Sequence, residues 1–288
     1  MIEDDTNIFS IMPMNQRFLL TPGETYEGTV MVVNPADAAA DFSFKAEVTP
    51  YSVMGAGYEA DLATMKNQSA IVDWITIENP TGTVAPNEVA EIRYTITVPE
   101  DAPGGGQYAT ITVGSDKDVQ ASESVTVNNV FEMASIIYAQ VEGEVIHEGE
   151  LQNVSIPGFV TKSPISVSAS FTNHGNAHED ATIITRVTNF LTGEVLLPSD
   201  DNTGKYTEVI MPDTERTVTQ DIDTVPALGI VNVEQTIYYM GTSSTNNSVI
   251  IVCPIWFMAL VALTIGAIIA TIAGLIVRHR HRKADLAF

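Results

Sequence analysis

The residues of this chain that could act as nucleophiles, bases or metal ligands are few and far apart. Cysteine occurs once, at Cys253, and only three histidines precede it: His147, His174 and His178. Nucleophilic catalysis needs an activated Ser, Cys or Thr beside a base that a third group orients. Neither a G-x-S-x-G nor an H-E-x-x-H pattern occurs. The sequence therefore predicts a protein with no catalytic residues, no enzymatic activity and no cofactor.

His174 and His178 are followed by two acidic residues and form the cluster closest to metal-ligand chemistry. An i, i+4 histidine pair binds a metal when a helix places both on one face, as in the H-E-x-x-H motif. Gly175 and Asn176 between them are typical of a turn. We therefore expect turn structure here, with a metal site as the less favoured alternative.

A second acidic stretch, Asp200, Asp201 and Asn202 before Gly204, resembles the start of a calcium loop. The EF-hand spacing fails, because no Glu follows at the twelfth position. An Asx turn between strands is the expected structure, and weak calcium binding by adjacent carboxylates stays open.

Exposed aromatic side chains are the candidates for binding a ligand. Tyr51 and Tyr58 flank a glycine-containing loop, and the alternation around Tyr108 places it on the outer face of its strand. Exposed aromatics can mark a binding site, although a cross-strand pair is an equal alternative for Tyr108. Trp74, in the strand-like stretch IVDWITI, is expected in the core.

The elements that must position these residues are predicted to be β-strands. Apolar residues alternate with polar ones in FSFKAEV (42–48), EIRYTITV (91–98), ESVTVNN (123–129) and SPISVSASF (163–171). Such alternation is typical of strands with one buried face, and Gly, Pro and Asn clusters separate them. The predicted fold is all-β: two tandem immunoglobulin-like sandwiches, over residues 1–148 and 149–241.

A long apolar run, residues 249–277, follows a short predicted stalk at 242–248. A helix of about 20 apolar residues crosses a bilayer, so the run predicts a transmembrane helix. Basic residues cluster on the cytoplasmic side of such helices. The tail at 278–288 contains Arg278, Arg280, Arg282 and Lys283. We therefore expect the tail inside and the domains outside, in a chain whose signal peptide has been removed; a tail-anchored cytosolic protein is the alternative.

Charge and cysteine content narrow the class of protein. The formal net charge is −23, from 13 basic and 36 acidic residues. Such a surface repels nucleic acid, because no basic patch can neutralise phosphates. Cys253 lies in the apolar run, so the predicted ectodomain forms no disulfide. Animal extracellular domains of this size usually have disulfides, which favours a bacterial or archaeal surface protein.

Small residues recur every fourth position within the apolar run, at Ala262, Gly266, Ala270 and Gly274. They share one helix face, where two helix backbones can approach closely. A homodimer through this face is therefore a hypothesis from the sequence.

The order of landmarks in the first half resembles a known family. These are LLTPGETYEGTVMVVNP (19–35), DWITIENPTGTVAPNEVAEIRYTITVPEDAPGGGQYATITV (73–113) and FEMASIIYAQVEGEV (131–145). They resemble the N-terminal domain of the WxL-interacting-protein family of bacterial surface proteins. The resemblance implies a peptidoglycan-binding first sandwich, a second sandwich, one membrane helix and a basic tail. It carries no individual binding residue to this chain.

Taken together, these features predict a non-enzymatic, membrane-anchored cell-surface protein. Its first sandwich would bind a cell-wall polymer, peptidoglycan, or a partner surface protein. One alternative is a structural or adhesive element that mediates protein–protein or cell–cell contact. A less favoured alternative is a surface chaperone that lends a strand to exported subunits.

Overall fold

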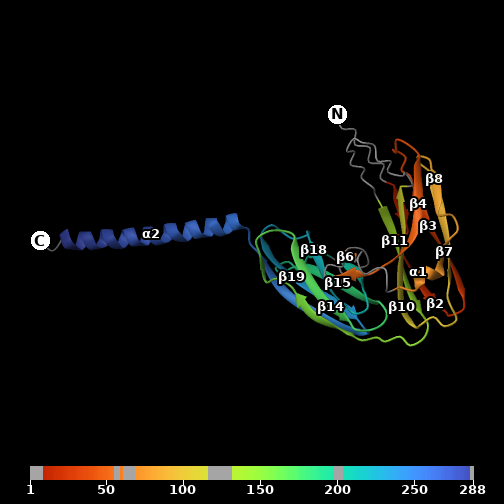
Figure 1. The fold of residues 1–288 in the computed structure, drawn as a ribbon. Coiled ribbons are helices and arrows are strands. Elements are labelled where there is room, and N and C mark those ends of the chain that lie inside the picture. The colour runs from red at the N-terminus through yellow and green to blue at the C-terminus, as the bar shows by residue number, and fades with distance from the viewer. Residues whose placement is uncertain (1–8, 55–58, 61–68, 116–131, 198–203, 286–288) are drawn as a thin grey trace, which may run out of the picture. The chain divides into compact units, whose positions relative to one another are not determined.

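The computed structural model describes residues 9–54, 59–60, 69–115, 132–197 and 204–285. Strands make up most of this part of the chain, and one long helix, α2 (Ile255–Asp285), follows them (Figure 1). The broad prediction, a β protein with one apolar C-terminal helix, is confirmed. The predicted strand at 123–129 lies outside the described residues.

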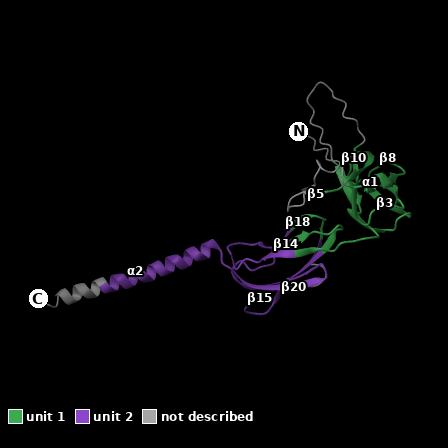
Figure 2. Cartoon of the chain, turned by 60° about the horizontal axis from the view of Figure 1, so that its bottom comes forward, with its two compact units in different colours: residues 1–150, 171–180, 209–216 green, residues 151–170, 181–208, 217–288 purple. Residues whose placement is uncertain are grey.

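The chain forms two compact units that interleave along the sequence (Figure 2). Unit 1 comprises residues 1–150 with two later segments, Phe171–Asp180 and Val209–Arg216. Unit 2 comprises Leu151–Ser170, Ala181–Glu208 and Thr217–Phe288. The units therefore do not follow one cut between residues 148 and 149.

Two sheets build unit 1 in its described part. One has the strand order β1 (Ser10–Met12), β3 (Thr25–Val33), β9 (Val89–Thr97), β7 (Ile75–Ile77). The other has the order β2 (Asn15–Leu20), β11 (Glu132–Val141), β10 (Gly105–Ser115), β4 (Phe42–Pro50), β8 (Thr81–Val84). A short hairpin, β5 (Val53–Met54) with β6 (Glu59–Ala60), and the helical turn α1 (Ile71–Trp74) complete it.

Alternate residues of these strands form the core of unit 1, as the period-two pattern predicted. The fully buried residues of this core come from both sheets and include Phe44, Ile92, Tyr94, Ile111 and Ile137. Trp74 is in the core as expected, 8% exposed, but it lies in α1 rather than in a strand.

Unit 2 is built on two further sheets. One has the order β12 (Gly149–Ser155), β14 (Ile165–Asn173), β18 (Thr214–Ile222). The other has the order β13 (Phe159–Val160), β20 (Thr242–Val252), β19 (Gly229–Tyr239), β15 (Glu179–Asn189), β16 (Val195–Leu197), and β17 (Lys205–Ile210) also pairs with β15. The ends of β14, β15, β17 and β18 lie in the two segments assigned to unit 1. The core of unit 2 includes Val167, Val187, Val233 and Ile250.

The structure corrects the predicted stalk and the start of the helix. Residues 242–248 are part of β20, which pairs with β19 from Thr242 to Val252. The polar composition of this stretch suggested a flexible linker, but its hydroxyl and amide side chains lie on a paired strand. Helix α2 begins at Ile255 rather than at residue 249, and it continues through the predicted tail to Asp285.

One segment of α2, Ile255–Ile276, is long and apolar enough to cross a membrane. The small-residue face lies in this segment, where nothing within 4 Å would meet a Cβ added at Gly266 or Gly274. Self-association through this face stays a prediction.

Candidate functional site

Strand β11 is only partly covered by its neighbour β2. The two run parallel from the pair Asn15–Ile136 to the pair Leu20–Val141. The backbone N–H of Ile136 donates to the carbonyl of Met14 at 3.0 Å. The residue before Met14 is Pro13, which has no backbone N–H. Strand β1, which precedes Pro13 in the chain, pairs with β3 of the opposite sheet. The chain thus changes sheets beside β11.

Among the described residues, the first residues of β11 therefore have a paired strand on one side alone. Backbone groups alternate between the two sides of a strand, so those of Glu132 and Ala134 point the same way as those of Ile136. Strand β10 pairs with the opposite side of β11 as far as Glu132. In the described part of the chain no strand pairs with Glu132 or Ala134 on the side of β2. We call Glu132–Ser135 the open edge; such an edge is a template for pairing with another chain.

Exposed methionines lie beside the open edge. Met12 is 51% exposed and Met14 is 62% exposed, and Met12 is paired across the ladder with the exposed Met31. The hydroxyl of Ser135 donates to the carbonyl of Pro13 at 2.7 Å, which holds this bend of the chain against β11. Methionine side chains adapt to partners of different shape and are frequent on promiscuous binding surfaces.

A groove of about 570 Å³ lies next to the same edge, over the outer face of β4, β10 and β11. Its walls include Glu132, Met133 and Ala134 at one side and Tyr51 on β4's side. Threonine hydroxyls line its floor, with Thr49 and Thr110 hydrogen-bonded at 2.6 Å. The remaining lining residues are Lys45, Glu47, Thr112, Gly114, Ser115 and Ile136. A polar floor beside exposed methionines suits an extended polypeptide, which has both kinds of group.

An aromatic cluster covers another part of this outer face. Tyr108 and Tyr138 are each 8% exposed and form an edge-to-face pair with centroids 6.1 Å apart. Tyr51 makes a similar contact with Tyr138, also at 6.1 Å, and Met211 packs against the cluster. Edge-to-face aromatic pairs of this kind contribute about 0.5–1.5 kcal/mol beyond their buried area.

Arg17 and Asp180 close one side of the cluster. The guanidinium donates two hydrogen bonds to the Asp180 carboxylate, at 2.7 and 2.8 Å, and lies 6.0 Å from the centre of the Tyr138 ring. Bidentate pairing restricts both side chains. Because both are more than 40% exposed, the pair contributes little to stability by itself.

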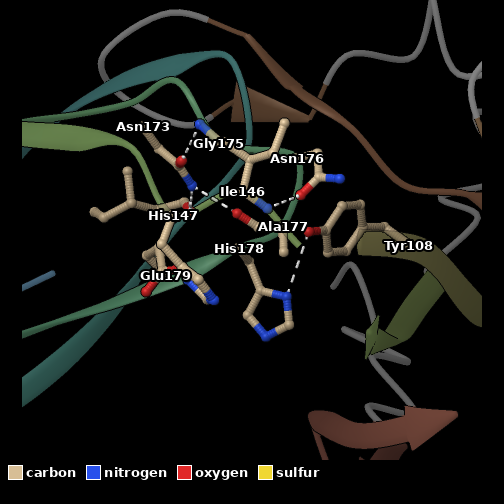
Figure 3. Close-up of polar contacts among 10 residues, drawn as sticks. Tyr108, Ile146, His147, Asn173, Gly175, Asn176, Ala177, His178 and Glu179 are labelled. Carbon is tan, nitrogen blue, oxygen red and sulfur yellow. Dashed lines mark hydrogen bonds and ion pairs between the residues drawn. The ribbon is translucent and has the colours of Figure 1, made fainter. Parts of the chain in front are cut away.

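His178 fills the space beside the two tyrosine rings. Its Nδ1 lies 3.3 Å from the Tyr108 hydroxyl (Figure 3), and its ring centroid lies 5.4 Å from that of Tyr138. Burial lowers the pKa of His178, and the positive charge of Arg17 lowers it further, against an opposite effect of Asp180. Burial has the opposite effect on the tyrosine hydroxyl and raises the pKa of Tyr138. The neutral forms of both side chains are therefore favoured.

The turn before His178 is held by two asparagines, as the sequence predicted (Figure 3). The Asn173 amide donates to the carbonyls of Ala177 and Ile210, and its oxygen accepts from the N–H of Gly175. Asn176 accepts from the N–H of Ile146 at 2.8 Å. These contacts make the region a structural turn. Nowhere in the described residues do three or more His, Cys, Asp or Glu side chains gather as a metal site.

The three tyrosines predicted to bind a ligand do not share one environment in the structure. Tyr51 lines the groove and is half-buried. Tyr108 lies on the outer face, as the alternation predicted, but residues such as His178 and Met211 cover it, so it is not free to bind. Tyr58 and the acidic stretch at 200–202 lie outside the described residues.

The open edge itself was missed by sequence reasoning. The available signal was Met12-Pro13-Met14, in which a proline interrupts an early strand between two apolar residues. Proline inside a strand pattern indicates an edge or a break, but it does not say which neighbouring strand loses its partner.

Comparisons with known proteins give a fold likeness and no family. No family model and no curated protein matches the chain. Among solved structures it is similar to the E. coli chaperone DraB, with 14% identity, a TM-score of 0.39, and coverage of 84% of this chain and 98% of that one. It is also similar to a chain from the complex of the Salmonella enterica SafA pilin with the SafB chaperone, with 11% identity, a TM-score of 0.38, and coverage of 86% and 98%. At such identities and TM-scores, no residue or role is carried over from these proteins.

These findings correct the predicted family. No model of the WxL-interacting-protein family, or of any other, matches, and the matched structures include fimbrial chaperones instead. Peptidoglycan binding and a cell-wall polymer as partner, which followed from that resemblance, are therefore wrong. In the matched complexes the chaperone is bound to a tip adhesin or a pilin, not to a wall polymer. The resemblance depended on turn residues and strand alternation, which many β-sandwiches share.

Proposed function

We propose that this protein is a non-enzymatic, membrane-anchored binding protein that pairs its open edge with an extended segment of a partner polypeptide, in the manner of a strand-lending chaperone. The observation that carries the proposal is the free side of Glu132–Ser135 beside Met12 and Met14. Strand addition uses main-chain hydrogen bonds for affinity and alternate side chains for specificity. The open edge supplies both.

The energetics indicate which partner would bind. Glu132 and Ala134 together present two N–H and two C=O groups, and each bond contributes about 0.5–1.5 kcal/mol net. The four bonds together contribute about 2–6 kcal/mol, and association costs about 4–15 kcal/mol in lost freedom, so these bonds alone give at most weak binding. The remainder comes from apolar contacts with the methionines, at about 25 cal/mol per Å² buried. The expected partner is therefore an extended segment with apolar residues at alternate positions.

The architecture forms the second part of the proposal. The sheets of strands β1–β11 and those of strands β12–β20 form two tandem immunoglobulin-like sandwiches, and α2 anchors them to a membrane. The basic residues Arg278, Arg280, Arg282 and Lys283 would stay on the cytoplasmic side, with the sandwiches outside. Protease added to intact cells then removes the sandwiches; their complete protection would contradict this orientation.

The experiment that tests strand pairing places a photo-crosslinking amino acid at Ala134 in the full chain, on cells that express it. The matched control carries the same amino acid at Leu19, which is 60% exposed on β2 but lies away from the open edge. We expect adducts from Ala134 whose attached partner peptide has alternating apolar residues. Equal adducts from both positions, or none from Ala134, would refute the proposed site.

A proline substitution separates backbone pairing from side-chain contact. Ala134→Pro removes one edge N–H without touching the ladder to β10, since prolines are tolerated at strand edges. We expect it to abolish the adducts formed from a crosslinker at Met14. Retention of those adducts would show that the partner does not pair with this backbone.

A further inference from the structure

Unit 2 exposes a row of apolar side chains at the end of its large sheet, next to the start of α2. Phe159 is 49% exposed and pairs across the ladder with Ile251, which is 47% exposed. Ile251 in turn faces Ile230 on β19. The N–H of Phe190, which is 55% exposed, donates to the carbonyl of Ile230 at 2.9 Å. The row thus crosses four neighbouring segments.

The outer face of β20 changes character along its length. Its exposed residues Ser243, Thr245 and Asn247 are polar, and the next two, Val249 and Ile251, are apolar. The apolar end is the one that continues into α2, because β20 ends at Val252 and α2 begins at Ile255. Scattered exposed apolar residues need no explanation, but a change of polarity in this direction indicates a change of surroundings.

The covalent geometry brings this end close to a bilayer. The apolar segment of α2 has 22 residues, about 33 Å at 1.5 Å per residue, and a hydrocarbon core is about 30 Å thick. The segment therefore has little length to spare, and Ile255 lies at the hydrocarbon boundary. Three residues reach at most about 11 Å, and the headgroup layer is about 5–7 Å thick on each side. The last residues of β20 thus lie in this layer or just above it.

The adjoining turn extends the same surface. Leu191, in the turn between β15 and β16, is 78% exposed, and Asn189 holds its backbone through a side-chain hydrogen bond of 2.9 Å. The row itself contains no charged side chain; Glu194 is the charged residue of this turn. Aromatic and leucine side chains favour the boundary between headgroups and acyl chains.

We propose that Phe159, Phe190, Leu191 and Ile251 enter the headgroup layer of the bilayer that α2 spans, so that this end of unit 2 rests on the membrane. The partner is the lipid surface itself. The backbone of Ile251 is already paired, since β20 has β19 on one side and β13 on the other, and a paired backbone favours contact with lipid. The inference depends on the membrane anchor proposed above and is independent of the open edge.

The test uses the full chain in phosphatidylcholine liposomes, with Cys253→Ser removing the native thiol. Leu191→Cys places an environment-sensitive fluorophore in the row, and Ser243→Cys places it at the far end of β20. Flotation first establishes that both variants are anchored; failure to float would refute the anchor and the inference with it. We expect the probe at position 191 to be quenched by nitroxide-labelled lipid and shielded from aqueous iodide, and the probe at position 243 to behave in the opposite way.

If both variants float, either of two results would overturn this inference and leave the membrane anchor in place. One is a probe at position 191 as open to iodide as that at position 243. The other is shielding from iodide without quenching by labelled lipid, which would assign the row to a protein contact. Phe159→Cys, labelled in the same way, gives an independent measurement from a different strand.

Discussion

Unit 1 and unit 2 both expose apolar side chains, but the backbone beside those side chains is paired differently. In unit 1 the exposed methionines Met12 and Met14 adjoin the open edge, where β11 has no described neighbour on the side of β2. In unit 2 the exposed Phe159 and Ile251 lie on strands that are paired with each other and, through β20, with β19.

The difference indicates the kind of partner that each surface can accept. Free N–H and C=O groups must be satisfied by water or by another polypeptide, because leaving them unpaired in an apolar environment costs several kcal/mol. A polypeptide can satisfy those of the open edge, and lipid cannot. A surface whose backbone bonds are complete can meet lipid with side chains alone. We therefore assign a polypeptide partner to unit 1 and a lipid partner to unit 2.

Proline substitutions at the two surfaces test this comparison most strongly. The N–H of Ile251 donates to the carbonyl of Gly158 at 3.0 Å, so Ile251→Pro should destabilise unit 2 by about 1–3 kcal/mol. Ala134→Pro should change the stability of unit 1 by no more than about 0.5 kcal/mol. Amide hydrogen exchange of the full chain in detergent measures both. Equal losses would mean that the N–H of Ala134 is already paired.

Removing the Asn173 side chain from the turn in unit 1 should lower the stability of the protein almost as much as Ile251→Pro does. Asn173 is fully buried and makes three hydrogen bonds to backbone groups. Asn173→Ala leaves those groups unsatisfied, at a cost of about 1–3 kcal/mol. Urea unfolding measures it, with Asn153→Ala on the exposed side of β12 as the control. A loss no greater than in the control would show that the turn does not depend on this side chain.

The methionines should affect binding without affecting stability. Met12→Gln with Met14→Gln should weaken partner binding about tenfold, equivalent to about 1.4 kcal/mol, because the adaptable apolar contact is lost. The unfolding free energy should stay within about 0.5 kcal/mol of the parent. Leu19→Gln is the control of similar exposure. An equal loss of binding in the control would show that the binding site is not confined to the open edge.

A weak pH dependence should distinguish unit 1 from unit 2. Burial and Arg17 lower the pKa of His178 in the folded protein, so the unfolded chain takes up a proton first as pH falls through about 6.5. The unfolded state then binds more protons, and stability decreases on acidification until the folded protein also protonates. The Tyr108 hydroxyl, Arg17 and Asp180 face this ring.

The measurement is urea unfolding of unit 1 at pH 7.5 and 5.0, for the parent chain and for His178→Phe. The substitution should remove part of the acid-dependent loss, because phenylalanine fits among aromatic rings and does not titrate. His174→Gln, at an exposed position, should keep the parent's loss. An unchanged slope in His178→Phe would exclude this histidine as the cause.

Local patterns in the sequence were sufficient for much of the fold. The alternation in 42–48, 91–98 and 163–171 predicted which residues of those strands are buried, because a strand places alternate side chains on opposite faces. Asn173 and Asn176 predicted a turn for a similarly local reason. The apolar length of 249–277 predicted a membrane-spanning helix, although its first residues belong to β20.

Long-range pairing decided the rest. Residues 242–248 look like a linker in composition, but pairing with β19 makes them a strand. Tyr108 has the alternation of an exposed residue and is buried by His178 and Met211, distant in sequence. The open edge lies where the chain passes, at Pro13, from β1 in one sheet to β2 in the other, over 100 residues before β11 reaches that place. Composition and periodicity describe a strand's own faces, and only the tertiary structure determines which neighbour lies beside each of its edges.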